Sequence, residues 1–282
     1  MTNALQPRPI VVVQNNHVER LTGPVAEAAR EAGIDIRDVS SGAEAEKHPP
    51  LPASGPWAPV LVFGSVHFCR RWAAADPVLS PWIHWTEEAF DAVVWAERLG
   101  DAMLNADGVA TTIGEFSSSD LSAMHLRPRG DMKFVGDAVR TEDATGQRSI
   151  PGIVVTPAEA GALGIDPGTG IWASPMRTID AEVRIWMVGG MPVSASTYRV
   201  DGAMHLSSTH PLVARAVAAA EKTHEVWSPA AHYVVDMALS GGEWRIVEFN
   251  PVHSAGWYDA DVSAILQALI AAETERVGRH PE

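Results

Sequence analysis

The sequence predicts an α+β fold with a small N-terminal α/β lobe, a middle lobe and a C-terminal lobe. Three observations support this prediction. Apolar residues make up 46% of the 282 residues and charged residues 20%, so the chain can bury a sizeable core. Short apolar runs alternate with a helical segment near the N-terminus, as in parallel α/β structure. The last third instead contains alternating strands joined by glycine turns, which indicate antiparallel hairpins.

The N-terminal lobe is expected over residues 1–78. Its apolar runs PIVVV and PVLVF are short and rich in β-branched residues, which favours buried strands. Pro24 suits the first turn of a helix, where its missing N–H is tolerated, and Gly33 suits the stop. The expected elements are strands at 9–13, 34–36 and 59–63, a helix at 23–31 and a Ser/Gly/Pro/Ala-rich loop at 40–58.

The middle lobe is expected over residues 79–172. Its first helix should begin at Thr86, because a threonine side chain can cap the first turn and the following acidic pair, Glu87 and Glu88, complements the helix dipole. The expected elements are helices at 86–101 and 157–163, strands at 124–126, 153–156 and 170–175, and a polar connection at 136–152.

The C-terminal lobe is expected over residues 173–282 and has the most regular pattern. Two strand pairs surround turn signals, the first at Gly189-Gly190 and the second at Ser240-Gly241-Gly242. The expected elements are strands at 182–188, 191–200, 232–239 and 243–249, an Ala-rich helix at 211–223 and an amphipathic helix at 262–276.

Charge and composition exclude several classes of function. The net charge of −14 argues against nucleic-acid or anionic-membrane partners, because both are polyanions. Cys69 is the one cysteine, so an intrachain disulfide is excluded, and it is expected to be a small buried apolar residue. Neither a signal peptide nor a membrane span is apparent, so we expect a soluble cytoplasmic protein.

A cluster of oxygen donors is expected on the last hairpin. Glu248 and Asn250 are two apart on one strand and therefore share a face, and Asp236 on the partner strand can join them. Two carboxylates and an amide oxygen suit Mg²⁺, with Mn²⁺ also possible, bridging phosphates. The pattern alone also allows an ordinary solvent-facing side of a sheet.

These residues carry a resemblance to a known family. The run 233–236 (YVVD) followed by 244–251 (WRIVEFNP) resembles the metal-binding end of the ATP-grasp superfamily. Upstream, 181–190 resembles its Glu-x-Arg strand and glycine turn, 171–175 its adenine hinge, and Arg127-Pro128 its Lys-Pro pair. The similarity covers roughly residues 80–260. It is greatest to a compact bacterial and phage branch in which a Pro and a Gly-aromatic loop follow the metal motif, here 251–258.

The resemblance implies an ATP-grasp fold that clasps ATP between the middle and C-terminal lobes. It assigns Asp236, Glu248 and Asn250 to Mg²⁺, and Arg184 and Arg199 to catalysis and substrate charge. It places the nucleotide against Arg127, Lys133, Trp172, Ala173, Ser174 and Glu182, and the acceptor pocket near Tyr198, His253, Ser254 and Tyr258. The residues alone also allow a cross-strand ion pair for Arg184, solvated Lys133 and Arg199, and a core or surface position for His253.

The implied activity is ligation of a small-molecule carboxylate to an amine. ATP would phosphorylate the carboxylate, and the amine would attack the acyl phosphate with release of ADP and phosphate. Two alternatives stay open: a nucleotide-binding protein without turnover, and a metal-dependent hydrolase using Asp236, Glu248, His232 and His253. A homodimer is also possible, with Trp82, Trp85 or Trp257 exposed at its interface.

Overall fold

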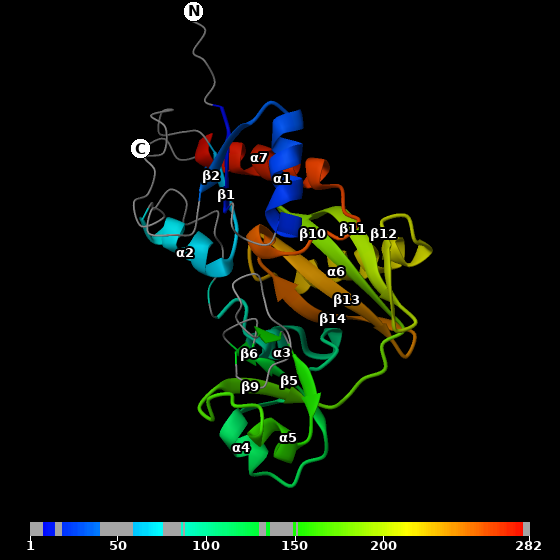
Figure 1. The fold of residues 1–282 in the computed structure, drawn as a ribbon. Coiled ribbons are helices and arrows are strands. Elements are labelled where there is room, and N and C mark those ends of the chain that lie inside the picture. The colour runs from blue at the N-terminus through cyan, green and yellow to red at the C-terminus, as the bar shows by residue number, and fades with distance from the viewer. Residues whose placement is uncertain are drawn as a thin grey trace, which may run out of the picture.

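The computed structural model describes residues 8–14, 19–39, 59–75, 86, 88–129, 134–135, 149–150 and 152–278. The expected loop at 40–58, most of the connection at 136–152, and Lys133, Trp82 and Trp85 lie outside these residues. The described chain forms three main sheets and one short hairpin. The N-terminal lobe lies at the top of Figure 1, a five-stranded sheet in the middle and a four-stranded sheet at the bottom.

The N-terminal lobe contains a parallel sheet in the order β2-β1-β3. Its apolar strands are buried as expected, and Cys69 is fully buried, which raises the pKa of its thiol. Helix α1 begins before the predicted start, so Pro24 lies inside it rather than in its first turn. Helix α2 was not anticipated from the sequence. The elements are β1 (Ile10–Gln14), α1 (Glu19–Glu31), β2 (Asp35–Val39), β3 (Val60–Phe63) and α2 (Val66–Ala75).

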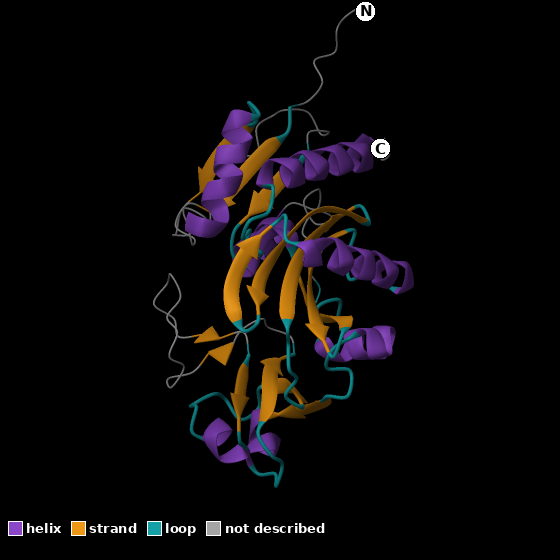
Figure 2. Ribbon diagram, turned by 90° about the vertical axis from the view of Figure 1, so that its right-hand side faces the viewer, coloured by secondary structure: helices purple, strands orange, loops and turns teal. Residues whose placement is uncertain are grey.

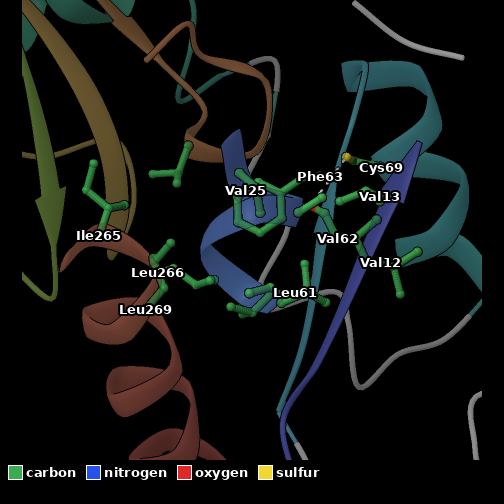
Figure 3. Packing of buried hydrophobic residues seen from close by; sticks show 14 of the residues in the cluster. Val12, Val13, Val25, Leu61, Val62, Phe63, Cys69, Ile265, Leu266 and Leu269 are labelled. Atoms are coloured by element: carbon green, nitrogen blue, oxygen red, sulfur yellow. Dashed lines mark hydrogen bonds between the residues drawn. The ribbon is translucent and has the colours of Figure 1, made fainter. Parts of the chain in front are cut away.

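The last helix, α7 (Val262–Gly278), completes the core of the N-terminal lobe rather than extending its own lobe. Its residues Ile265, Leu266 and Leu269 are buried in one cluster with Val25 of α1 and the strands β1 and β3 (Figure 3). The first and last thirds of the chain therefore share a hydrophobic core.

The four-stranded sheet has the order β4-β9-β5-β8, and its outer face packs against α4 and α5. Leu126, Ile171 and Ala173 are buried there. The elements are β4 (Val109–Thr112), α4 (Ile113–Ser117), β5 (Met124–Pro128), β8 (Ile153–Val155), α5 (Pro157–Gly161) and β9 (Gly170–Ser174), with β6 (Phe134–Val135) and β7 (Ser149–Ile150) forming the short hairpin. The lobe boundary expected at 172/173 falls within β9.

The helix expected at 86–101 begins later than predicted. Helix α3 spans Ala92–Leu99 and is capped by Asp91, whose side chain accepts a hydrogen bond from Val93 N at 2.9 Å. Thr86 instead accepts from Ala89 N at 3.0 Å in a separate turn, so its expected capping role was wrong. The short η2 turn (Gly100–Ala102) follows α3. The buried side of α3 packs on the five-stranded sheet, where Trp95 meets Phe249 edge to face.

The five-stranded antiparallel sheet has the order β12-β11-β10-β13-β14. Helices α6 and α3 cover one face, and the opposite face meets the N-terminal lobe through Trp186 and Val188 (Figure 2). Both predicted hairpins are confirmed, whereas β12 was not expected. The elements are β10 (Ala181–Val188), β11 (Met191–Val200), β12 (Ala203–Ser207), α6 (Pro211–Val226), β13 (His232–Ser240), β14 (Glu243–Asn250) and η3 (Val252–Ser254).

Trp257 does not have the surface position expected of an interface residue. It is 5% exposed and stacks on Trp186 with ring centroids 5.9 Å apart. It therefore belongs to the core between the five-stranded sheet and the N-terminal lobe. Among the helices of the described residues, none combines the length and apolarity that a membrane crossing requires.

A buried polar network ties α7 to the five-stranded sheet. Glu273 contacts His232 Nε2 at 3.2 Å and accepts from Arg276 Nε at 2.8 Å. His232 Nδ1 accepts from Gly189 N at 3.0 Å, so a neutral imidazole donates Nε2–H to the carboxylate. Burial opposes ionisation of Glu273, but the hydrogen bonds from His232 and Arg276 outweigh it and lower the pKa of its carboxyl group.

We expect Glu273→Gln to lower the free energy of unfolding by about 1–3 kcal/mol, because buried donors lose a charged acceptor. The lowered pKa means that Glu273 stabilises the fold above its unfolded pKa of about 4.3, and that this contribution disappears as pH falls through the folded value. Urea unfolding at pH 7 and at pH 3.5 should therefore show a wild-type advantage only at pH 7. The exposed Glu221→Gln serves as the control, and equal stability of both proteins at pH 7 would contradict the expectation.

Candidate functional site

The predicted oxygen cluster forms on the face of the five-stranded sheet opposite α6. In the strand register Asp236 of β13 lies between Arg184 of β10 and Glu248 of β14. A β-bulge next to Asp236 adds Val247 to β14 and turns its carbonyl out of regular pairing. The three strands thus place one cation and two carboxylates side by side.

Arg184 and Asp236 form a bidentate ion pair. Arg184 Nε donates to Asp236 Oδ1 at 2.7 Å, and Nη2 donates to Oδ2 at 2.6 Å. Both side chains are buried. The remaining amino group, Nη1, donates to the Gly256 carbonyl at 3.3 Å, and Nη2 lies 3.7 Å from Glu248 Oε1. The guanidinium is therefore fixed between strand β13 and the loop after β14.

The electrostatics of the cluster follow from burial and pairing. Burial raises the pKa of Asp236 to about 7, against the attraction of Arg184 and with a further increase from Glu248. Burial disfavours the charged form of Arg184, but Asp236 outweighs it and raises the pKa of the guanidinium. Burial also opposes ionisation of Glu248, yet Arg127, Arg184 and the Asn250 amide together lower its pKa. Glu248 therefore stays ionised more readily than Asp236.

Arg127 reaches the cluster from the other sheet. It lies on β5, and its Nη1 donates to the Val247 carbonyl at 3.3 Å while Nη2 lies 3.5 Å from Glu248 Oε2. Its guanidinium packs 4.6 Å from the centre of the Trp95 ring. Burial lowers the pKa of Arg127, opposed by Glu248. The basic residue expected near the nucleotide is thus brought to the predicted metal residues.

Asn250 completes the donor set. Its Nδ2 lies 3.0 Å from Glu248 Oε1 and 3.5 Å from Asp236 Oδ2. The amide orientation is an assignment, and rotation by 180° would turn Oδ1 toward the same point. Within the described residues, no group of three or more His, Cys, Asp or Glu side chains forms a metal site, so the amide oxygen is needed to complete this one.

An aromatic wall borders Arg184. The rings of Tyr198 and Tyr258 stack 5.0 Å apart, and the Arg184 guanidinium lies 4.9 Å from the Tyr258 ring centre. Tyr198 donates its hydroxyl to Glu182 Oε1 at 2.8 Å, and Arg199 lies 3.3 Å from Glu182 Oε2. Tyr258 has a φ of +53°, a strained conformation for a non-glycine residue. Arg184 pairs with Asp236, not with Glu182 as one interpretation of the sequence allowed.

Other predicted residues lie further from the cluster. Trp172 is buried and donates its indole N–H to the Asn105 carbonyl at 3.0 Å, and Ala173 and Ser174 are buried beside it in β9. His253 is buried, and its carbonyl accepts from Gly64 N of the N-terminal lobe at 3.1 Å. Ser254 Oγ is also buried. His232 is held by Glu273 and Gly189, which removes it from the ligand set that a hydrolase would need.

Sequence reasoning missed three contributors to this region. Trp95 supports Arg127, the Gly256 carbonyl holds Arg184, and Arg129 forms a bidentate ion pair with the helix cap Asp91, with Nη2 donating to Oδ2 at 2.8 Å. The spacing of two between Arg127 and Arg129 is the one signal that could have been used, because it places both on one face of β5.

The sheets and the Asp-Glu-Asn cluster define the architecture of an ATP-grasp protein. A family model agrees: the model of the ATP-grasp domain, clade family 3, matches residues 84–269. The chain belongs to this family. No curated protein shows significant sequence similarity to it.

Solved structures share the fold over nearly the whole chain. D-alanine–D-alanine ligase from Bacillus anthracis superposes with a TM-score of 0.58 at 11% identity, covering 96% of this chain and 99% of that one. The ATP-grasp ligase PsnB in complex with a minimal precursor gives 0.52 at 13% identity, with coverages of 94% and 99%. A RimK domain ATP-grasp protein from Sphaerobacter thermophilus gives 0.56 at 13% identity, with coverages of 93% and 99%.

We expect Arg184→Met to destabilise the protein by about 3–5 kcal/mol, because it leaves Asp236 buried without its partner. Adding Asp236→Asn to this variant should restore a large part of the loss, since the unpaired charge is then removed. Chemical denaturation of both variants measures the coupling. Arg215→Met on the exposed side of α6 is the control, and a single variant as stable as this control would contradict the expectation.

Proposed function

We propose that the protein is an ATP- and Mg²⁺-dependent carboxylate-amine ligase that forms an amide bond through an acyl phosphate. The observation that carries this proposal is the meeting of Arg127 and Arg184 with Asp236, Glu248 and Asn250, residues from two sheets. Anion-binding guanidiniums beside hard oxygen donors suit a magnesium-bound polyphosphate. Family membership and the ligases among the structural neighbours support the same conclusion.

The residues present fit a magnesium ion. Two carboxylates and a carboxamide converge within hydrogen-bonding distances of Asn250 Nδ2, and oxygen donors of this kind are those that Mg²⁺ prefers. Asp236, Glu248 and Asn250 would hold it, with Asp236 shared with Arg184. When bound, Mg²⁺ supplies neutralisation of phosphate charge. Mn²⁺ has the same ligand preferences and is a possible substitute.

The chain's own residues would act by positioning and by charge. Arg184 is fixed by Asp236 and Gly256 O, so its charge is preorganised beside the metal residues. Arg127 reaches the same point from β5 and would bind phosphate oxygens from the opposite side. The expected partner of these cations, Lys133, remains a proposal from the resemblance.

The proposed chemistry needs no nucleophile from the protein. A carboxylate oxygen of the substrate attacks the γ-phosphorus of ATP, the bond to the bridging oxygen breaks, and ADP leaves. The amine then attacks the acyl carbon, phosphate leaves with the electron pair of the C–O bond, and the amine loses a proton. Holding the reactants in line and excluding water would be the main contribution of the protein.

The two small-molecule substrates are proposed to bind beyond Arg184. Arg199 is half-exposed next to Glu182, so a substrate carboxylate can reach its guanidinium. Tyr198 and Tyr258 form the adjoining wall, and His253 and Ser254 lie in the loop that follows the metal residues. The adenine of ATP is proposed to meet the backbone at Trp172, Ala173 and Ser174, with Glu182 also in the nucleotide region.

A nucleotide-binding protein without turnover is the second candidate. The observation in its favour is that Arg184 binds both oxygens of Asp236, which a metal would have to share. The two candidates differ in one respect, since a ligase releases ADP when both substrates are present and a binding protein does not.

We expect Glu248→Ala to lower Mg²⁺-dependent ATP affinity at least tenfold, because the variant removes a carboxylate that lies between both guanidiniums. Calorimetric titration with ATP and with ADP, with and without Mg²⁺, measures this change. Glu243→Ala is a matched control on the same strand, where Glu243 is exposed and pairs with Arg245. Unchanged affinity in a folded Glu248→Ala protein would remove the metal assignment. The absence of any nucleotide binding by wild type would overturn the proposed function.

Steady-state ADP release should appear when pooled carboxylates and pooled amines are added together, and should stay near background with either pool alone. Coupled detection of ADP and of phosphate tests this, and the two products should form in equal amounts. Arg199→Gln should raise the KM for the active carboxylate while leaving ADP affinity unchanged. Nucleotide binding without release under any combination would favour the second candidate.

A further inference from the structure

Strand β5 presents a histidine that has no place in the proposed chemistry. Met124 and Leu126 point into the core below α4 and α5, so the alternating residues His125 and Arg127 share the opposite face. Arg127 contacts Glu248 and Val247 from this face. His125 is therefore directed to the side where the two sheets meet, and the charges of both Arg127 and Glu248 act on it.

The surroundings of His125 are polar on one side and apolar on the other. Its strand partners are Val154 on β8 and Ser174 on β9, and residues directly opposite in a sheet share a face. Val154 is 47% exposed, although its neighbour Val155 is buried in the outer core. An apolar side chain is thus left uncovered next to the imidazole.

The imidazole itself is only partly satisfied. Its Nδ1 is buried and has no hydrogen-bond partner among the described residues. The ring lies against Gly152, where a β-carbon would come within 2.7 Å of Nε2, so only glycine leaves room for it. A buried nitrogen without a partner is unfavourable and calls for an explanation, such as a bound group that completes it.

The position of His125 along β5 indicates which part of a ligand it would meet. It lies two residues, about 7 Å, from Arg127 toward the end of the sheet at which β9 finishes with Ser174. The linker to β10 begins there, and its Met176 is 61% exposed. His125 therefore lies between this linker and the arginine that contacts the predicted metal residues.

We propose that His125 and Val154 together contact the nucleoside part of the bound nucleotide, with His125 Nδ1 hydrogen-bonding it and Val154 packing against it. This inference rests on the proposed function and deepens it, because it adds two residues that determine nucleotide affinity. Recognition of the nucleoside and of the phosphates is then divided between two residues of one strand, His125 and Arg127.

Calorimetric titration of His125→Leu with ADP and with adenosine, both in the presence of Mg²⁺, tests the inference. His125→Leu should weaken both ligands by a similar factor of at least ten. Arg127→Met should weaken ADP and leave adenosine within twofold of wild type. His205→Leu on the exposed strand β12 replaces a histidine away from the site and should change neither affinity.

A conservative variant separates binding from folding. His125→Asn places an amide near the position of Nδ1 and should recover most of the ADP affinity, which a merely structural loss would not allow. Circular dichroism and thermal unfolding confirm that each variant is folded. ADP affinity within twofold of wild type in His125→Leu, or a loss confined to ADP with adenosine unaffected, would overturn the inference. Failure of wild type to bind ADP would instead overturn the proposed function.

Discussion

The buried ion pair between Arg184 and Asp236 is the constraint on which the site depends. Two charges on neighbouring central strands are costly to bury, and they are tolerated because two short hydrogen bonds and the Gly256 carbonyl satisfy the guanidinium. The pair fixes the position of Asp236 and brings a second carboxylate, Glu248, into a field of positive charge. The loop after β14 is held by the same arginine, so the metal residues and the aromatic wall are positioned by one side chain.

Contacts between lobes complete this arrangement. Arg127 joins the four-stranded sheet to β14 through a carbonyl that the β-bulge frees, and Trp95 of α3 supports the guanidinium from the other side. Helix α7 returns to the N-terminal lobe, and its Glu273 binds His232 at the start of β13. The strand that carries Asp236 is therefore anchored at one end by this network and in its middle by Arg184. Such over-determination keeps a cluster of like charges preorganised.

Much of the fold could be predicted because hydrophobic periodicity is local. The strands near 9–13 and 59–63 and both C-terminal hairpins follow from apolar runs and glycine turns, and all are present. The shared face of Asp236, Glu248 and Asn250 also follows from strand alternation. Local signals failed where two were available. Thr86 and Asp91 are both good capping residues, and only packing of Trp95 on Phe249 selects Asp91. The edge strand β12 carries little apolar pattern that could distinguish it from a loop, and its side chains are largely exposed.

The sequence by itself determined which elements form, the α+β class and the residue types of the oxygen cluster, because these depend on neighbours a few positions apart. Only the tertiary structure decided which charges pair. Arg184 could have met Glu182 on its own strand, and it meets Asp236 52 residues away because antiparallel register places them opposite each other. Likewise Trp257 is buried rather than exposed, since its stacking on Trp186 requires the loop to fold back over the sheet. Long-range register and burial are set by the free energy of the whole packed structure, which no local pattern contains.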